Sequence, residues 1–214
     1  MIKAILFDVD GVLVDSLKAN TVFYQYVMEK NGYRKPTAAE YLKVFNLPFD
    51  DTMAALSKEK DKRKLRAVMA NAVEERRDKY PLWMIKAPAG AQSTIKLLSK
   101  HYKLGIATSR TRTAAEQVIS QVYKINCFSV VITRQDYRRR KPSPDLLVAA
   151  AKRLRLRHSE IVYVGDMATD AEAARAAGMH FVLFNSKRIP GVKCLAKKFS
   201  EIPRIVKRLD EGLC

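Results

Sequence analysis

The sequence places two carboxylates, Asp8 and Asp10, directly behind a short apolar run that ends at Phe7, and a glycine follows at position 11. The run Ile2–Phe7 is long enough for one buried strand and too short for a helix. In an open α/β sheet, reactive groups collect just beyond the carboxyl ends of the strands. Two acids at such a point could bind a metal ion and attack an electrophile together, so we interpret Asp8 as a nucleophile.

Three more groups of polar residues follow apolar runs further along the chain. These groups are Thr108 with Ser109, Lys141 in a basic loop, and Asp166 with Asp170. Parallel strands would bring all of these residues to the same edge of a sheet, beside Asp8 and Asp10. The assembled set would contain four carboxylates, a pair of hydroxyls and one lysine.

This combination of side chains favours phosphoryl chemistry. Four carboxylates in one cleft repel each other, and a divalent cation would compensate them. Oxygen ligands without His or Cys suit Mg²⁺. A metal ion, a lysine, hydroxyls and loop N–H groups form a receptor for a phosphoryl group, whose transfer depends mainly on positioning and charge neutralisation. A nucleophilic Asp8 would divide hydrolysis into two easier steps through an aspartyl-phosphate.

Apolar spacing predicts which elements position these residues. The stretch from Leu17 to Tyr80 is helical throughout and contains no strand. Its expected helices are Leu17–Asn31, Thr37–Val44, Asp51–Leu56 and Asp61–Tyr80. The last of them carries Leu65, Val68, Met69, Ala72 and Val73 on one apolar face.

Beyond residue 81, short apolar runs alternate with helices of about ten to fifteen residues, which indicates βαβ crossovers and a parallel sheet covered on both faces. The expected strands are Ile2–Phe7, Lys103–Thr108, Ser129–Thr133, Ile161–Val164 and His180–Phe184, with Cys194–Ala196 as a short edge strand. The expected helices are Ala91–His101, Thr111–Tyr123, Pro144–Leu156, Ala168–Ala177 and Ser200–Leu209.

The sequence therefore predicts an α/β fold with a doubly wound, Rossmann-like parallel sheet and an inserted all-helical domain. Residues 1–15 and 82–214 are expected to form the core domain, because the sheet needs its first strand. Residues 16–81 are expected to form a helical cap that hinges over the carboxyl ends of the strands as a lid.

The chain is strongly basic. It contains 40 Lys and Arg against 22 Asp and Glu, a formal net charge of +18. Such a surplus attracts anions, among them nucleic acid and phosphorylated metabolites. The basic residues are spread along the chain and no nucleic-acid-binding motif accompanies them. The charge indicates the sign of a partner, and nucleic acid is expected to bind only through non-specific charge.

Other bulk features concern the compartment. No apolar run approaches the roughly 20 residues of a membrane-spanning helix. The N-terminal apolar run is short and ends in aspartates, unlike a signal peptide. Cys127, Cys194 and Cys214 are an odd number without close spacing, which predicts three free thiols in a reducing compartment. We expect a cytoplasmic monomer or homodimer without a membrane partner.

The four groups together resemble the motifs of the haloacid dehalogenase (HAD) superfamily. They are Asp8-Val-Asp10-Gly11, Thr108-Ser109, Lys141-Pro142 and Gly165-Asp166 with Asp170. All four occur in the order of the family, and the resemblance covers the whole chain. The helical insert between the first two groups is similar to the small α-helical cap of phosphoglycolate phosphatase-like enzymes.

The resemblance implies a role for each residue of the reaction. Asp8 would be the nucleophile, and Asp10 the general acid that protonates the leaving oxygen and then deprotonates water. The phosphoryl oxygens would be bound by Thr108, Lys141, the N–H group of Ser109, and the backbone around Gly11, where the missing side chain permits close approach.

The resemblance also implies a Mg²⁺ site. Its ligands would be Asp8, Asp166 and the backbone carbonyl of Asp10, and Asp170 would hold a metal-bound water. Many relatives have Asn where this chain has Ser109, which affects the subfamily more than the site.

Each group alone has a simpler explanation. Asp10-Gly11 is a common turn after a strand, Thr108–Thr111 could only cap a helix, and Lys141-Pro142 could belong to an ordinary loop that opens a helix. Their joint occurrence at matching strand ends favours the catalytic interpretation.

The predicted function is a Mg²⁺-dependent phosphatase for a small phosphorylated metabolite. One alternative is phosphoryl transfer to a second hydroxyl of a sugar phosphate, as in the related β-phosphoglucomutase. Another is a basic nucleic-acid-binding protein on an inherited phosphatase scaffold, although the complete set of catalytic residues argues against lost activity. A dehalogenase would lack the second acid, Asp10, so dehalogenation is disfavoured.

Overall fold

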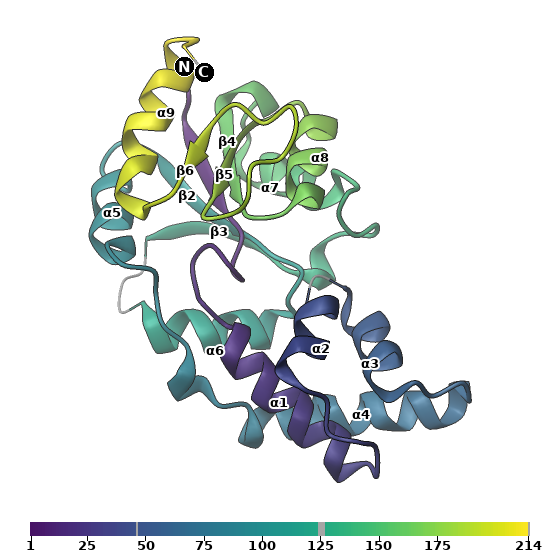
Figure 1. The fold of residues 1–214 in the computed structure, drawn as a ribbon. Helices are drawn as coiled ribbons and strands as arrows, with labels where there is room; N and C mark the ends of the chain where they lie inside the picture. Colours follow the sequence, from purple (N-terminus) through teal and green to yellow (C-terminus); the bar gives the residue numbers. More distant parts are fainter. Residues whose placement is uncertain (46, 124–126, 214) are drawn as a thin grey trace. The chain divides into compact units, whose positions relative to one another are not determined.

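The protein is described from a computed structural model, in which residues 1–45, 47–123 and 127–213 are described. The chain divides into two compact units. Residues 1–15 and 86–214 form the first unit, which contains the sheet, and residues 16–85 form the second, whose described elements are all helical (Figure 1).

The first unit is built on a parallel sheet, which confirms the fold class predicted from the sequence. Its described strands are β1 (Ala4–Phe7), β2 (Lys103–Ala107), β3 (Phe128–Ile132), β4 (Ile161–Gly165), β5 (His180–Phe184) and β6 (Leu195–Ala196). They lie in the order β3-β2-β1-β4-β5-β6, and every neighbouring pair is parallel. The order reverses at β1, which therefore lies in the middle of the sheet beside β2 and β4.

Side chains of β1 alternate between the two faces of the sheet, as the pleat requires. Leu6 joins a buried cluster with Leu147 of α7 (Asp145–Leu154) and Ala174 of α8 (Ala168–Ala177). Phe7 points to the opposite face and stacks on Phe199, with ring centroids 5.9 Å apart. The next residue, Asp8, continues this alternation toward the face covered by α7 and α8.

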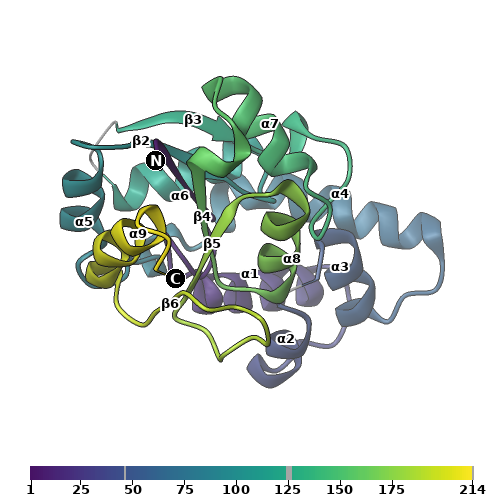
Figure 2. The ribbon, with the colours of Figure 1, turned by 90° about the horizontal axis from the view of Figure 1, so that it is seen from above.

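Helices cover both faces of the sheet, as Figures 1 and 2 show. The helices α7 and α8 pack on one face, and α5 (Ala91–Leu98) and α9 (Ile202–Asp210) lie together on the other. The helix α6 (Arg112–Val122) connects β2 to β3. Each crossover helix therefore returns the chain to the amino edge of the sheet, and every described strand ends at the same carboxyl edge.

Four helix ends differ from the prediction by two residues or more, and the first is the start of α3 (Phe49–Ser57), which the sequence predicts at Asp51. The helix α5 ends at Leu98, because the N–H groups of Lys100 and His101 bond in tighter turns to the carbonyls three residues before them. The helix α7 ends at Leu154, where Arg155 adopts a left-handed conformation with φ 56°. A 3₁₀ turn over Phe199–Glu201 delays the start of α9. Apolar spacing cannot detect these local changes in hydrogen bonding.

The second unit contains α1 (Leu17–Lys30), α2 (Ala38–Val44), α3 (Phe49–Ser57) and α4 (Lys62–Lys79). Thr37 and Asp61 cap α2 and α4 with their side-chain oxygens. Val68 and Ala72 of α4 are buried, but Val73 is 66% exposed, so its predicted place on the apolar face is wrong. Residues 68 and 72 share one helix face, whereas residue 73 is turned about 100° away from residue 72.

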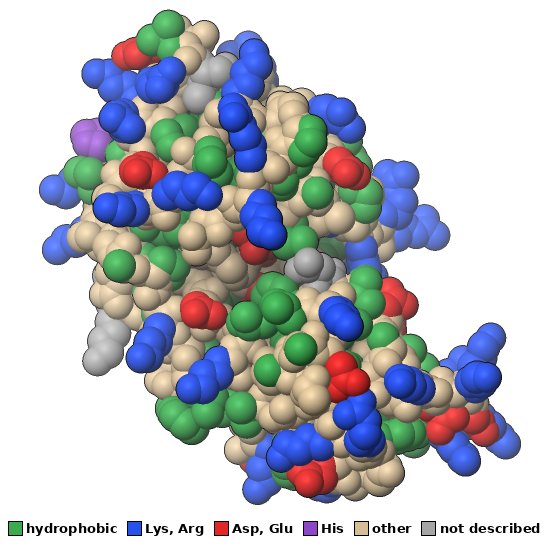
Figure 3. Space-filling model, viewed as in Figure 1, with side chains coloured by type: hydrophobic (Ala, Val, Ile, Leu, Met, Phe, Trp, Pro, Cys, Tyr) green, Lys and Arg blue, Asp and Glu red, His purple; other side chains and the backbone are tan. Residues whose placement is uncertain are grey.

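The basic residues of the surface lie as the sequence predicts, but one of the cysteines does not. Lys and Arg side chains are spread over the face shown in Figure 3 rather than gathered in one place. Cys127 is a free thiol. Cys194 is disulfide-bonded, so the expected free thiol is wrong there, and Cys214 lies outside the described residues. None of the helices described is both long and apolar enough to cross a membrane.

Candidate active site

The register of the sheet brings three of the predicted groups to one edge. Phe7 of β1 is paired with Ile106 of β2 and with Val164 of β4. The residues that follow these strands therefore lie side by side. The backbone N–H of Asp8 donates to the carbonyl of Val164 at 3.0 Å, which fixes the chain as it leaves β1.

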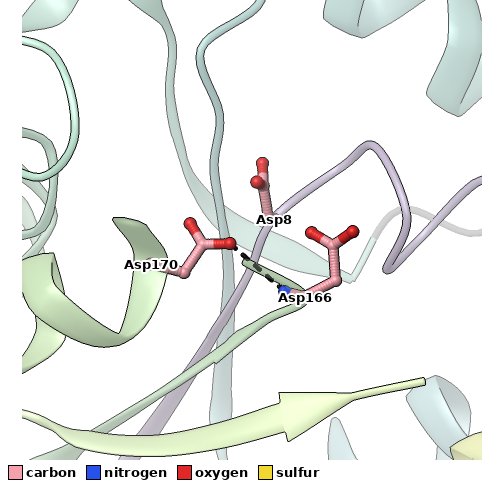
Figure 4. Close-up of side chains that lie close together, drawn as sticks. All are labelled: Asp8, Asp166 and Asp170. Atoms are coloured by element: carbon pink, nitrogen blue, oxygen red, sulfur yellow. Dashed lines mark hydrogen bonds between the residues drawn. The ribbon is translucent and has the colours of Figure 1, made fainter. Parts of the chain in front are cut away.

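Three carboxylates meet at this edge, as Figure 4 shows. Asp8 follows β1, Asp166 follows β4, and Asp170 lies in the first turn of α8. One oxygen from each lies within 4.8 Å of the others. Asp170 is fully buried, and its Oδ2 accepts hydrogen bonds from the N–H groups of Asp166 (3.2 Å) and Met167 (3.1 Å). These bonds tie the β4–α8 turn to the cluster.

Lys141 is the cation of the cluster. Its Nζ donates to Asp8 Oδ2 and to Asp170 Oδ1, at 2.6 Å in each case, and lies 3.3 Å from the hydroxyl of Tyr163. The Tyr163 hydroxyl donates to Asp170 Oδ1 at 2.9 Å. The structure therefore joins Lys141 to two of the predicted aspartates from a loop that is distant in sequence.

Burial and like charge raise the pKa of two of the carboxyl groups. Burial, with a further contribution from Asp170, raises the pKa of Asp8 to about 6, against the opposing effect of Lys141. Burial and the charges of Asp8 and Asp170 raise the pKa of Asp166 to about 8. Burial alone would lower the pKa of Lys141, but Asp170 and Asp8 hold it well above its usual range. One lysine thus leaves the three carboxylates incompletely compensated.

A divalent cation fits this cluster. Its carboxylate oxygens are the hard donors that Mg²⁺ prefers. The negative charge of three carboxylates is larger than the single positive charge of the lysine beside them. Gly11 leaves room on the same side, because it adopts φ 75° and a Cβ there would lie 2.1 Å from Asp166 Oδ2. Any side chain at position 11 would displace the Asp166 carboxylate.

Asp145 organises the loop that carries Lys141. Its carboxylate accepts hydrogen bonds from the backbone N–H of Arg139 (2.9 Å), from the guanidinium of Arg139 (2.7 Å) and from the hydroxyl of Ser143 (2.8 Å). The Arg139 guanidinium holds the pKa of Asp145 well below its usual range. The basic loop is therefore fastened on both sides of Lys141, at Arg139 and at Ser143.

Thr108 and Ser109 follow β2 but differ in exposure. Thr108 is buried; its N–H donates to the carbonyl of Ile132 at 3.0 Å, and its hydroxyl accepts from the N–H of Arg110 at 3.2 Å. Ser109 is exposed. Among the described residues the Thr108 hydroxyl makes no hydrogen bond to Asp8 or Lys141, so the structure places it at the same edge without joining it to the cluster.

Asp10 is not a member of the group of three carboxylates, and its side chain forms an ion pair with Arg110. The guanidinium donates from Nε to Asp10 Oδ2 at 2.7 Å and from Nη2 to Oδ1 at 2.6 Å. The resemblance implies the backbone carbonyl of Asp10 as a metal ligand, and this role stays a prediction. Sequence reasoning assigned no role to Arg110 or to Tyr163. The available signal was their position, within or directly behind strands that carry the motifs.

Gly165 has no room for a side chain beside Asp170. We therefore expect Gly165→Ala to destabilise the fold by about 2 kcal/mol or more through overpacking. A Cβ at this position would lie 2.5 Å from Asp170 Cβ and 2.6 Å from its Cγ. Asp170 is rooted in the first turn of α8, so the turn itself would have to move. Urea unfolding measures the change.

Gly178→Ala is the matched control for this prediction. Gly178 has φ 68°, and a Cβ added there would meet no neighbouring atom within 4 Å, so only backbone strain is expected, about 1 kcal/mol. Equal losses in the two variants would show that the contact with Asp170 is not the constraint.

Comparison with known proteins shows the family of the chain. Residues 5–184 match the family model of haloacid dehalogenase-like hydrolases. The chain is 26% identical to a phosphoglycolate phosphatase of Cereibacter sphaeroides over 185 residues, which cover 84% of each protein. It is 24% identical to a phosphorylated carbohydrates phosphatase of Thermotoga maritima over 179 residues, which cover 83% of this chain and 82% of that protein.

The fold is also found in a solved structure. The crystal structure of CbbY from Rhodobacter sphaeroides in complex with phosphate superposes with a TM-score of 0.76 at 18% identity, covering 94% of this chain and 96% of that one. This likeness shows the fold alone. Because the family match spans most of the chain and includes all four groups of polar residues, the protein belongs to the haloacid dehalogenase-like hydrolases.

Proposed function

We propose that this hydrolase is a Mg²⁺-dependent phosphatase for a small phosphorylated metabolite and that it works through an aspartyl-phosphate on Asp8. The observation that carries the proposal is the cluster at the carboxyl edge of the sheet, in which the Asp8 carboxylate lies against Lys141 and beside Asp166 and Asp170. The names of the relatives, which are phosphatases of phosphoglycolate and of phosphorylated carbohydrates, support the same class of substrate.

In the proposed reaction, an oxygen of the Asp8 carboxylate forms a bond to phosphorus and the bond from phosphorus to the leaving oxygen breaks. Asp10 gives its proton to that leaving oxygen. In the second step a water oxygen attacks the same phosphorus, Asp10 takes the proton of the water, and the bond to Asp8 breaks. The carboxylate is returned unchanged, and phosphate and an alcohol are released.

Other residues of the chain would bind and orient the phosphoryl group. Lys141 already contacts Asp8 at 2.6 Å and can neutralise charge on the phosphoryl oxygens next to it. Thr108, Ser109 and Gly11 follow neighbouring strands at the same edge, where their hydroxyl or N–H groups can donate to the remaining oxygens. Tyr163 would act on Lys141 rather than on the substrate, since its hydroxyl lies between Lys141 and Asp170.

The residues that would hold Mg²⁺ are Asp8, Asp166 and the backbone carbonyl of Asp10, with Asp170 next to them. The ion would supply positive charge that offsets the clustered carboxylates and the phosphoryl oxygens. Burial and the neighbouring carboxylates raise the pKa of Asp166 to about 8, and this preference for an added positive charge supports a cation site here.

The experiment that tests the proposal is a screen for phosphate release from phosphoglycolate, sugar phosphates, nucleotides and pyrophosphate in the presence of Mg²⁺. We expect release from at least one class, and complete loss of the activity when EDTA removes the ion. Activity that persists in EDTA would contradict the proposed metal site, and no release from any compound would contradict the proposed activity.

A readout that does not depend on catalysis tests the same site. Because a ligand that binds only the folded state raises its stability, we expect Mg²⁺ to raise the melting temperature of the unmodified protein. The Asp166→Asn variant should lose this stabilisation, since it removes one charged ligand. Glu211→Gln, a change at the end of α9, serves as the control and should respond to Mg²⁺ as the unmodified protein does. An undiminished response in Asp166→Asn would place the ion elsewhere.

The cap role predicted for residues 16–81, which lie in the helical unit 16–85 of the structure, stays a prediction. Choice among phosphorylated substrates is expected to depend on this unit, since Asp8, Lys141 and Thr108 are assigned to the group that is transferred.

A further inference from the structure

Although basic residues occur along the whole chain, their balance with acids changes near its C-terminal end. Residues 185–208 contain eight Lys and Arg and one acid, Glu201. They span the loop after β5, the edge strand β6 and most of α9, and β6 and α9 lie side by side in Figures 1 and 2. This segment therefore concentrates positive charge away from the face of the sheet toward which Asp8 continues.

A cavity of about 490 Å³ is lined by residues of both β6 and α9. Four of the lining residues are cations: Lys193 and Lys197 lie on either side of β6, and Arg204 and Arg208 belong to α9. The two arginines are four positions apart, so they share one face of the helix, with their Cβ atoms about 6 Å apart. The volume is within the range of roughly 300 to 1,000 Å³ that small-molecule sites occupy.

The charges of these four side chains are not compensated by acids. Lys197 Nζ donates to the carbonyl of Ser186 at 2.9 Å, and Arg208 Nη2 donates to the carbonyl of Leu213 at 3.0 Å. Both acceptors are neutral, so the two cations keep their full charge. The side chains of the other two cations form no hydrogen bond or ion pair among the residues that the structure describes.

Glu201 also lines the cavity, but its carboxylate is occupied by backbone groups. Oε2 accepts hydrogen bonds from the N–H groups of Lys197 at 2.7 Å and Lys198 at 3.2 Å. These two bonds, with the positive charges of Arg204 and Lys198, hold the pKa of Glu201 below its usual value. Glu201 thus caps the turn that precedes α9, and the lining keeps a surplus of three positive charges.

We propose that this cavity binds a chain of linked phosphate groups, as found in inorganic polyphosphates and in nucleoside triphosphates. Guanidinium groups bind phosphate oxygens in a bidentate way, and lysines bind them as point charges. Cations on two sides of one cavity suit an anion with more than one phosphate. No aromatic side chain is found among the described lining residues, so recognition depends on the phosphates and not on a stacked base. The lining includes no residue of the carboxylate cluster, and the inference is independent of the proposed function.

Protection of the sheet edge is a simpler role for some of these residues. β6 is the last strand in the described sheet, and lysines beside a short edge strand discourage its pairing with another chain. That role involves Lys193 and Lys197 but not the arginines of α9. A general basic field, in turn, would not distinguish these arginines from other cations of the chain. A specific site predicts that Arg204 and Arg208 matter more than an equal number of charges elsewhere.

Titration calorimetry with inorganic triphosphate tests the site in the whole protein, after removal of divalent cations and of the chelator that extracts them. Without a metal ion, the three carboxylates at the carboxyl edge of the sheet repel an anion and should contribute little to the signal. We expect one triphosphate per chain, and we expect inorganic phosphate to bind more weakly by a factor of about ten or more, because it cannot reach cations on both sides. ATP should bind within a factor of about three of triphosphate, since its base finds no stacking partner.

The test variant combines Arg204→Gln with Arg208→Gln and should weaken triphosphate binding by a factor of about ten or more. The matched control combines Lys152→Gln with Arg155→Gln, at the end of α7 on the other face of the sheet. It removes the same number of charges from residues that form no ion pair in the described part of the chain. Its affinity should stay within a factor of about two of the unmodified protein, the effect of the general field alone. Arg204→Gln alone, which breaks no described contact, should have an intermediate effect.

The melting temperature provides a second readout and shows whether the variants fold. Without ligand, both double variants should melt close to the unmodified protein, because none of the replaced side chains has an acidic partner. Triphosphate should raise the melting temperature of the unmodified protein and of the control, but not that of the variant without both arginines. Four results would each overturn the inference: equal weakening in the two double variants, no weakening without the arginines, equal affinity for phosphate and triphosphate, or binding of ATP without binding of triphosphate.

Discussion

Asp8→Asn is expected to lower kcat for any phosphate ester by about 10⁴-fold or more, because it removes the atom that forms the covalent bond to phosphorus. The substituted amide keeps the shape of the carboxylate, and its oxygen can still accept the hydrogen bond that Val9 N–H donates to Asp8 at 2.7 Å. The measurement is Mg²⁺-dependent release of nitrophenol from p-nitrophenyl phosphate, a substrate whose leaving group needs little help from an acid.

The fold should survive this change. Burial raises the pKa of Asp8 to about 6, so the ionised carboxylate is less favourable in the folded protein than in the unfolded chain. A raised carboxyl pKa means that ionisation above that pH costs stability, and a neutral amide avoids this cost. Lys141 loses Asp8 but keeps Asp170 as its partner, so the melting temperature of Asp8→Asn at neutral pH is expected to stay close to that of the unmodified protein.

Asp210→Asn is a control with the same chemical change at a different place. Asp210 ends α9 and pairs with the amino terminus at the amino edge of the sheet, away from the strand ends that carry the cluster. Its activity should equal that of the unmodified protein. Full activity in Asp8→Asn would remove the nucleophile from its assigned position.

Lys141→Met is expected to lower both activity and stability. Lys141 binds two carboxylates, Asp8 and the fully buried Asp170, so its loss leaves both without their cation. Removing one partner of a buried ion pair typically costs about 3–5 kcal/mol. Without its positive charge at the phosphoryl oxygens, kcat should fall by about 10²-fold to 10³-fold. Urea unfolding without divalent cations measures the stability, and phosphate release with Mg²⁺ measures the activity.

Two further variants test how much of this effect comes from the charge of Lys141. Tyr163→Phe removes only the hydroxyl that bonds to Asp170 and Lys141, and should cost about 1 kcal/mol. Adding Asp170→Asn to Lys141→Met removes the buried charge that was left unpaired. The double variant should therefore be more stable than the two separate losses predict. Strictly additive losses would mean that the ion pair does not explain the effect of Lys141.

Much of the core could be predicted from the sequence because its apolar pattern has a clear period. Runs of four or five apolar residues separated by amphipathic segments are compatible with few folds other than a parallel sheet with crossover helices. The same pattern places Asp8, Thr108 and Asp166 at strand ends, and parallel strands share their carboxyl edge. The observed cluster of Asp8, Asp166 and Asp170 with Lys141 follows from that topology together with the charge of the residues.

Other features depend on contacts between residues that are distant in sequence, which spacing does not encode. The pair of Arg110 with Asp10 joins residues 100 positions apart, and that of Lys141 with Tyr163 joins two separate elements. Exposure of Val73 depends on which part of α4 has a packing partner, not on its own hydrophobicity. The same limit applies to the disulfide at Cys194, because a thiol in the sequence carries no sign of its partner.

The proposed reaction depends on a covalent bond between Asp8 and phosphorus, and chemical trapping can detect this bond. Asp10→Asn should slow the second step, which needs a base, while p-nitrophenyl phosphate still permits the first. Quenching this variant during turnover, reducing it with borohydride and sequencing its peptides by mass spectrometry should show homoserine at position 8, the product expected from a reduced aspartyl-phosphate. No homoserine should form without substrate or in a protein that also carries Asp8→Asn. Homoserine at another aspartate, or phosphate release without any reduced residue, would contradict a covalent intermediate on Asp8.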